Sequence, residues 1–170
     1  SSVEGIYEDY DAENKLVQHV TVDHDVPLTF WRSVGHSYTA FAKESLVDEL
    51  AEKVGQDEVE FRLQNSANNP RLNNVIKVAQ TKMQAMQPAA GRHLGFAAHN
   101  SFFTDVAEIA EVSVENNQIK VHKVTCVVDC GIAVNPEVVR GQMEGAVMYG
   151  LTAALHGDLD LEQGVFKQSN

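Results

Sequence analysis

Apolar residues recur at helical spacing in the first half of the chain. In residues 37–55 this spacing predicts a helix, and Gly55 supplies its stop signal. The apolar positions that define this helix are Ala40, Val47, Leu50, Ala51 and Val54. A second, shorter helix is predicted to start at Asp57, with Glu60 three residues on as a capping-box partner.

Two further helices start with the same dipeptide, an asparagine followed by proline. Asn69 suits the N-cap and Pro70 the first helical position of a helix over residues 69–83. The pair recurs at Asn135 and Pro136, where it opens the most apolar helix of the chain, residues 135–157.

The remaining segments show the alternation of strands. Residues 4–26 predict two strands around a turn at 11–14. Residues 103–115 and 118–129 flank Asn116 and Asn117, which predicts a hairpin with a tight turn. Residues 158–170 predict two short strands around Gly164. The order of elements therefore indicates an α+β fold, with helices packed on a largely antiparallel sheet, as a single domain over residues 1–170 without an internal boundary.

One junction between a strand-like and a helical segment has an unusual combination of side chains. Residues 31–35, WRSVG, place the only tryptophan beside Arg32 just before the first helix. The simple interpretation is a capped helix with an arginine that reaches to solvent. The alternative is a cofactor or substrate site, and the pattern alone leaves both open.

Small residues leave parts of the surface of the last long helix without bulky side chains. Gly141, Gly145 and Gly150 all fall inside it, and each interior glycine costs about 1 kcal/mol relative to alanine. A backbone or a bulky ligand lying close to the helix would compensate for this cost. Gln142 lies in the same patch, and its amide can both donate and accept hydrogen bonds. Tight packing of the helix on a sheet, with Gln142 half-exposed, is the competing explanation.

Composition and charge narrow the function classes. The chain is 44% hydrophobic and 22% charged, which is typical of a globular domain. A formal charge of −11 disfavours nucleic acid and anionic lipid as partners. No apolar run is long enough to predict a membrane-spanning helix, and no signal peptide is visible in residues 1–170.

No pattern predicts a metal site or a catalytic group. Cys126 and Cys130 form a lone CxxxC without further ligands, and their strand-like surroundings predict small core residues. The histidines are scattered, and none shows the spacing of a metal pair on one helix. Asp105 and Asp129 are single carboxylates with no visible partner, so no general base is predicted.

Four segments together resemble a known enzyme family. Residues 30–51, 91–112, 128–157 and 164–170 are similar, in matching order, to the large, molybdopterin-binding (beta) subunit of the isoquinoline 1-oxidoreductase group. They resemble more distantly the wider xanthine dehydrogenase and aldehyde oxidase family. The most specific motifs are WRSVG at 31–35 and VNPEVVRGQMEG at 134–145.

The resemblance implies a molybdenum hydroxylase. Such oxidoreductases hydroxylate a ring carbon next to nitrogen in an N-heterocycle, or oxidise an aldehyde, with water as the oxygen source. Electrons pass from molybdenum to iron–sulfur clusters, so the implied partners are a small [2Fe-2S] subunit and a small-molecule substrate. The pterin holds the metal, so no protein metal ligand is expected.

The resemblance also implies which residues contact the molybdopterin cofactor. Arg32 matches an arginine that lies close to the cofactor and substrate, and Gln142 matches a glutamine at the cofactor, with Gly145 allowing close approach. Val34 stands where an aromatic residue often stacks on substrate in the family, so this chain departs from the pattern there.

Several family motifs do not occur in residues 1–170: a GGGFG loop, a Gly-Gln-Gly turn and the catalytic glutamate of a VGEP-like segment. We therefore expect this chain to be a fragment of the large subunit, inactive alone and prone to self-association through an unpaired edge. Substrate, electron acceptor and compartment, cytoplasmic or periplasmic, stay open. The alternatives are a non-catalytic scaffold and a small-molecule-binding module that kept the fold.

Overall fold

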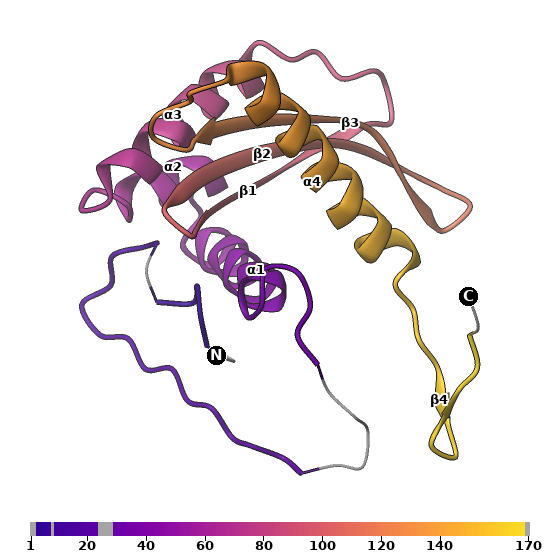
Figure 1. The fold of residues 1–170 in the computed structure, drawn as a ribbon. Helices are drawn as coiled ribbons and strands as arrows, with labels where there is room; N and C mark the ends of the chain where they lie inside the picture. The colour runs from indigo at the N-terminus through magenta and orange to yellow at the C-terminus, as the bar shows by residue number, and fades with distance from the viewer. Residues whose placement is uncertain (1–2, 8, 24–28, 169–170) are drawn as a thin grey trace. The chain divides into compact units, whose positions relative to one another are not determined.

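The computed structural model describes residues 3–7, 9–23 and 29–168. Nine helices and strands are assigned within these residues (Figure 1). They are α1 (His36–Val54), α2 (Glu58–Gln64), α3 (Pro70–Gln84), β1 (His93–Ser101), β2 (Thr104–Glu115), β3 (Gln118–Asp129), α4 (Pro136–His156), β4 (Leu161–Glu162) and β5 (Val165–Phe166).

Contacts group these elements into two compact units. The first holds the described residues up to His19 together with Arg32–Ile132, and so contains α1 to β3. The second holds the described residues of 20–31 and those from Ala133 onward, and so contains α4, β4 and β5. The expectation of one domain without an internal boundary stays a prediction.

The predicted helix boundaries follow from their caps. The side chains of Asn69 and Asn135 accept hydrogen bonds from the backbone N–H groups of Leu72 and Val138, at the starts of α3 and α4. The helix α1 ends at Gly55, whose φ of 68° is readily adopted by glycine. Asp57 caps α2 by accepting from two backbone N–H groups, which confirms the predicted start of this helix.

The sheet of the first unit is antiparallel, in the order β1-β2-β3. The predicted hairpin is confirmed, because β2 and β3 meet at Asn116 and Asn117, with φ values of 52° and 61°. Two successive left-handed residues are typical of the tight turn that matches strand twist. The short β4 and β5 strands around Gly164 are also confirmed. The mixture of helices with an antiparallel sheet confirms the α+β class.

The core of the first unit lies between α3 and one face of the sheet. Four apolar residues of α3 (Leu72, Val75, Ile76 and Ala79) form a cluster with Val59 and with Phe96, Ala98, Ala107 and Ile109 of the sheet. Phe96 lies opposite Ile109, and Ala98 opposite Ala107, in the β1–β2 register. The period of α3 and the alternation of the strands therefore meet in one buried layer.

A buried arginine joins α1 to α2. Arg62 is fully buried, and its Nε donates to Glu44 Oε2 at 2.9 Å. The same carboxylate oxygen accepts from the backbone N–H of Ala98 in β1 at 2.7 Å. The ion pair therefore also connects the helices to the sheet.

The prediction of two strands in residues 4–26 was wrong for the described part of that segment. No strand is assigned within residues 3–7 or 9–23, and residues 8 and 24–26 lie outside the described residues. Leu16, Val20 and Val22 are 80%, 79% and 72% exposed. Alternation predicts a strand only where a second backbone supplies the ladder hydrogen bonds, and no described segment pairs with this one.

None of the helices in the part of the chain that the structure describes combines the length and the hydropathy that a membrane-spanning helix needs.

Candidate functional site

The turn before α1 has an unusual backbone. Ser33 and Val34 have φ values of 71° and 49°, in the left-handed region that a β-branched residue rarely adopts. The Ser37 hydroxyl donates to the Val34 carbonyl at 2.8 Å, and the His36 N–H donates to the Ser33 carbonyl at 3.0 Å. Such strain costs on the order of 1–3 kcal/mol and is concentrated at functional sites.

The helix α1 has Gly35 at its N-cap and no side-chain hydrogen bond there. Gly35 therefore caps this helix without a side-chain acceptor, and both interpretations of the WRSVG segment stay open. Arg32, at the beginning of this turn, has an exposed side chain. Its predicted role at the cofactor stays a prediction.

In the second unit, Trp31 packs on α4. Its ring lies 5.1 Å from that of Tyr149, at an interplanar angle of 32°. Tyr149 follows Gln142 by seven residues, so the two lie on the same face of the helix. The tryptophan of the WRSVG motif thus packs against the helix that carries Gln142. Arg32 belongs to the unit of the sheet, so its place in the same site as Gln142 stays a prediction.

The helix α4 has no buried residue along its 21 positions. Gln142 and Gly145 are both exposed. A Cβ added at Gly141, Gly145 or Gly150 would meet no atom of the described residues within 4 Å. Within the second unit, no described residue therefore makes the close approach that would compensate for these glycines.

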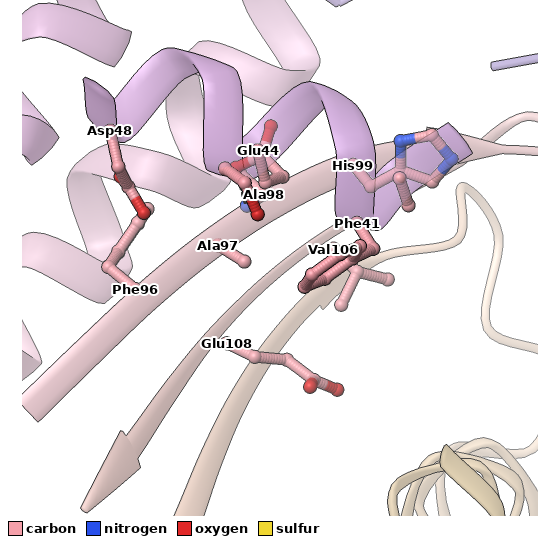
Figure 2. Close-up of a pocket in the computed structure, with 11 residues that line it drawn as sticks. Phe41, Glu44, Asp48, Phe96, Ala97, Ala98, His99, Val106 and Glu108 are labelled. Atoms are coloured by element: carbon pink, nitrogen blue, oxygen red, sulfur yellow. Dashed lines mark hydrogen bonds between the residues drawn. The ribbon is translucent and has the colours of Figure 1, made fainter. Parts of the chain in front are cut away.

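A pocket of about 420 Å³ lies in the first unit, between α1 and the strands β1 and β2 (Figure 2). Apolar and acidic side chains share its wall, among them Phe41, Phe96, Val106, Glu44, Asp48 and Glu108. Burial raises the pKa of Glu108, while a hydrogen bond with the Cys126 thiol opposes that shift. Since Glu44 is bound to Arg62 and Ala98, its charge is already compensated within the fold.

Cys126 and Cys130 were predicted to be small core residues. Both are free thiols of intermediate exposure, so they are only partly buried. Burial, reinforced by the nearby Glu108 carboxylate, raises the pKa of Cys126 to about 12. A thiol with so high a pKa is a poor nucleophile and a poor metal ligand at neutral pH.

The structure also brings together ionisable residues that are scattered in the sequence. His99 Nδ1 lies 2.9 Å from Asp9 Oδ2, and His99 Nε2 lies 2.9 Å from His36 Nδ1. Lys43 forms an ion pair with the same Asp9 carboxylate. These four residues come from the N-terminal segment, α1 and β1, so no local spacing could have indicated the cluster. Among the described residues, no group of three or more His, Cys, Asp or Glu could hold a metal ion.

Comparison with known proteins identifies relatives over nearly the whole chain. The family model described as "Molybdopterin cofactor-binding domain" matches residues 37–170. The chain is 31% identical, over 95% of its length, to the beta subunit of isoquinoline 1-oxidoreductase from Brevundimonas diminuta. It is 30% identical, over 91% of its length, to a subunit of nicotinate dehydrogenase from Pseudomonas putida. The chain spans only 21% and 15% of the lengths of these two relatives.

Proposed function

This chain belongs to the molybdopterin cofactor-binding domain family, and from that premise we propose that it forms part of the large subunit of a molybdenum hydroxylase. The observation that carries the proposal is the helix α4, a fully formed helix with no buried residue and three bare glycine positions. The matched region includes this helix, since it extends over residues 37–170.

The residues of α4 fit a bound molybdopterin. Its glycines leave open space where a Cβ would otherwise stand, so a flat and bulky group can lie against the backbone. Gln142 is exposed beside this space, and its amide can donate to a phosphate oxygen or pair with a heterocycle edge. When bound, the molybdenum centre would supply the two-electron oxidation chemistry.

Arg32 is the second proposed cofactor contact. A guanidinium keeps its charge at all accessible pH values and offers a planar fork of donors suited to phosphate and oxyanion groups. The strained backbone that follows it, at Ser33 and Val34, would hold the arginine in one direction.

For the substrate we propose an N-heteroaromatic ring rather than an aldehyde. Support comes from the two relatives, whose names refer to isoquinoline and nicotinate. Val34 cannot stack on such a ring as an aromatic side chain would, so recognition would rely on other groups of the large subunit.

We further propose that the intact enzyme contains a small [2Fe-2S] subunit as electron acceptor, and that the 170-residue chain alone does not turn over substrate. Both relatives are named as subunits, which supports the existence of partner chains. The chain's share of the relatives' length, 21% and 15%, supports the expectation that the chain alone is inactive.

The test is the molybdenum and pterin content of the large subunit that we propose contains this sequence. The variant Gln142→Ala should lower the metal content per folded protein, because it removes an amide at the cofactor. Glu144→Ala is the matched control, since Glu144 is also exposed but lies two positions along α4, on another face.

Two outcomes would contradict the proposal in different ways. If the unmodified large subunit contains no molybdenum, the function is wrong. If it contains molybdenum and the two variants retain it equally, the function stands and the assignment of Gln142 is wrong.

A further inference from the structure

The pocket between α1 and the strands β1 and β2 has the size and the lining of a small-molecule site. Its volume is about 420 Å³, which falls within the range of about 300–1,000 Å³ that is typical of ligand pockets. All of its lining residues belong to the first unit, so the pocket is formed within that unit alone. Phe41, Phe96 and Val106 form much of the wall, and such side chains suit the apolar part of a ligand.

Three acidic side chains line this pocket, and two of them already have a counter-charge. Glu44 Oε2 accepts from Arg62 Nε at 2.9 Å, and Asp48 Oδ1 lies 2.7 Å from Arg62 Nη1. Both carboxylates therefore belong to the ion pair that joins α1 to α2. Because one guanidinium serves two carboxylates, this part of the wall keeps an excess of negative charge.

Glu108 is the third acidic side chain, and it forms no ion pair with a cation among the described residues. Its neighbours in the strand register are Ala97 of β1 and Cys126 of β3, which carry no positive charge. The Cys126 thiol is its hydrogen-bond partner, and a thiol is a weak donor. Figure 2 shows the Phe41 ring reaching from α1 towards the strands and the Glu108 side chain extending from β2. The pocket therefore combines an apolar wall with an uncompensated carboxylate.

We propose that this pocket binds a small organic cation, an ammonium group attached to a body with a single aromatic ring. The ammonium would pair with the Glu108 carboxylate, and the ring would lie against Phe41 and Val106. A charge-assisted hydrogen bond of this kind is stronger than a neutral one. The formal charge of the chain, −11, also favours the approach of a cation over that of an anion. This inference does not rest on the proposed function, since none of these residues is assigned to the cofactor.

The test is a titration of the full 170-residue chain with two ligands of nearly the same shape. Phenethylamine is protonated at neutral pH, whereas phenethyl alcohol is neutral. Binding is followed by the amide chemical shifts of the lining residues Ala97, Ala98 and Val106. We expect the amine to bind about tenfold more tightly than the alcohol, because only the amine makes the charge-assisted contact.

Two variants separate the carboxylate from the apolar wall. Glu108→Gln removes the charge with little change of shape, so it should weaken amine binding about tenfold and leave alcohol binding unchanged. Glu111→Gln is the matched control, because Glu111 lies in the same strand but pairs with Arg92 at 2.6 Å, outside the lining of the pocket. Phe41→Ala should weaken the binding of both ligands by the same factor. The Phe41 side chain is 76% exposed, so its loss should leave folding intact.

Several results would overturn the proposal. One is equal affinity for the amine and the alcohol, and another is an amine affinity that Glu108→Gln leaves unchanged. Absence of binding by both ligands would overturn it as well. If Glu108→Gln does not fold, the comparison of the two ligands in the unmodified chain and in Phe41→Ala still tests the site. None of these measurements depends on molybdenum, so their failure leaves the proposed function as it stands.

Discussion

Each of the two units of this chain contains a long helix with an asparagine N-cap and a proline at its first position. Only one of these two helices has buried side chains. The helix α3 has an Asn cap, a proline at its first position and five buried residues, four of which join the core. The helix α4 has the same Asn cap and proline, is 21 residues long and buries none of its side chains. Most helix stability in proteins comes from packing, so α4 is locally well specified but lacks the contacts that stabilise α3.

The two helices differ in what packs against their side chains. The apolar face of α3 is buried inside the sheet unit, whereas no described residue of the second unit lies close to Gly141, Gly145 or Gly150 of α4. This contrast supports the proposal that α4, and not α3, contacts the cofactor.

The largest expected effect concerns the buried arginine of the first unit. Arg62→Ala removes the partner of Glu44 and leaves a buried carboxylate without its counter-charge. We expect a loss of about 3–5 kcal/mol in the free energy of unfolding, measured by urea denaturation of the chain. Arg92→Ala, which removes a partly buried pair with Glu111 near the surface, should cost less, about 1 kcal/mol. Equal losses for the two variants would show that the α1–α2 junction does not depend on the buried pair.

A smaller loss of stability is expected when either of the two asparagine caps is removed. Asn69→Ala and Asn135→Ala each remove one side-chain acceptor at a helix N-terminus, worth about 1 kcal/mol. The loss at Asn69 should appear in the global unfolding of the sheet unit, because α3 forms its core. The loss at Asn135 should appear only as faster amide exchange along α4. If Asn135→Ala destabilises the sheet unit equally, the two units unfold together and the comparison fails.

The smallest effect is a pH dependence of the ion pair between Arg71 of α3 and Asp129 of β3. Hydrogen bonds from Arg71, and then from the Gly131 N–H, lower the pKa of Asp129 to about 2. A lowered pKa in the folded state means that this carboxylate stabilises the fold above its ordinary pKa of 3.8 and loses the effect as pH falls towards 2. The difference in stability between the unmodified chain and Asp129→Asn should therefore shrink between pH 5 and pH 2. A difference that stays constant over this range would show that the Asp129 carboxylate does not titrate as described.

The sequence alone determined the local features of the molecule. Caps at Asn69, Asn135 and Asp57, the stop at Gly55 and the turn at Asn116–Asn117 all follow from interactions within a few residues, so the printed order of amino acids was enough to predict them. The family could also be predicted, since its motifs are contiguous and the family model matches residues 37–170. The roles of Arg32, Gln142 and Gly145 stay predictions.

Tertiary structure decided everything that depends on distant partners. Arg71 meets Asp129 across 58 positions, and His99 meets Asp9 across 90, so neither pairing has a signal in local spacing. The strand prediction failed in the described part of residues 4–26 for the same reason, because alternation sets the two faces of a strand but not the backbone that must pair with it. Short-range hydrogen bonds depend on residues that are close in the sequence, so local patterns predict them. Ion pairs and strand pairing between distant segments form only once packing has brought those segments together.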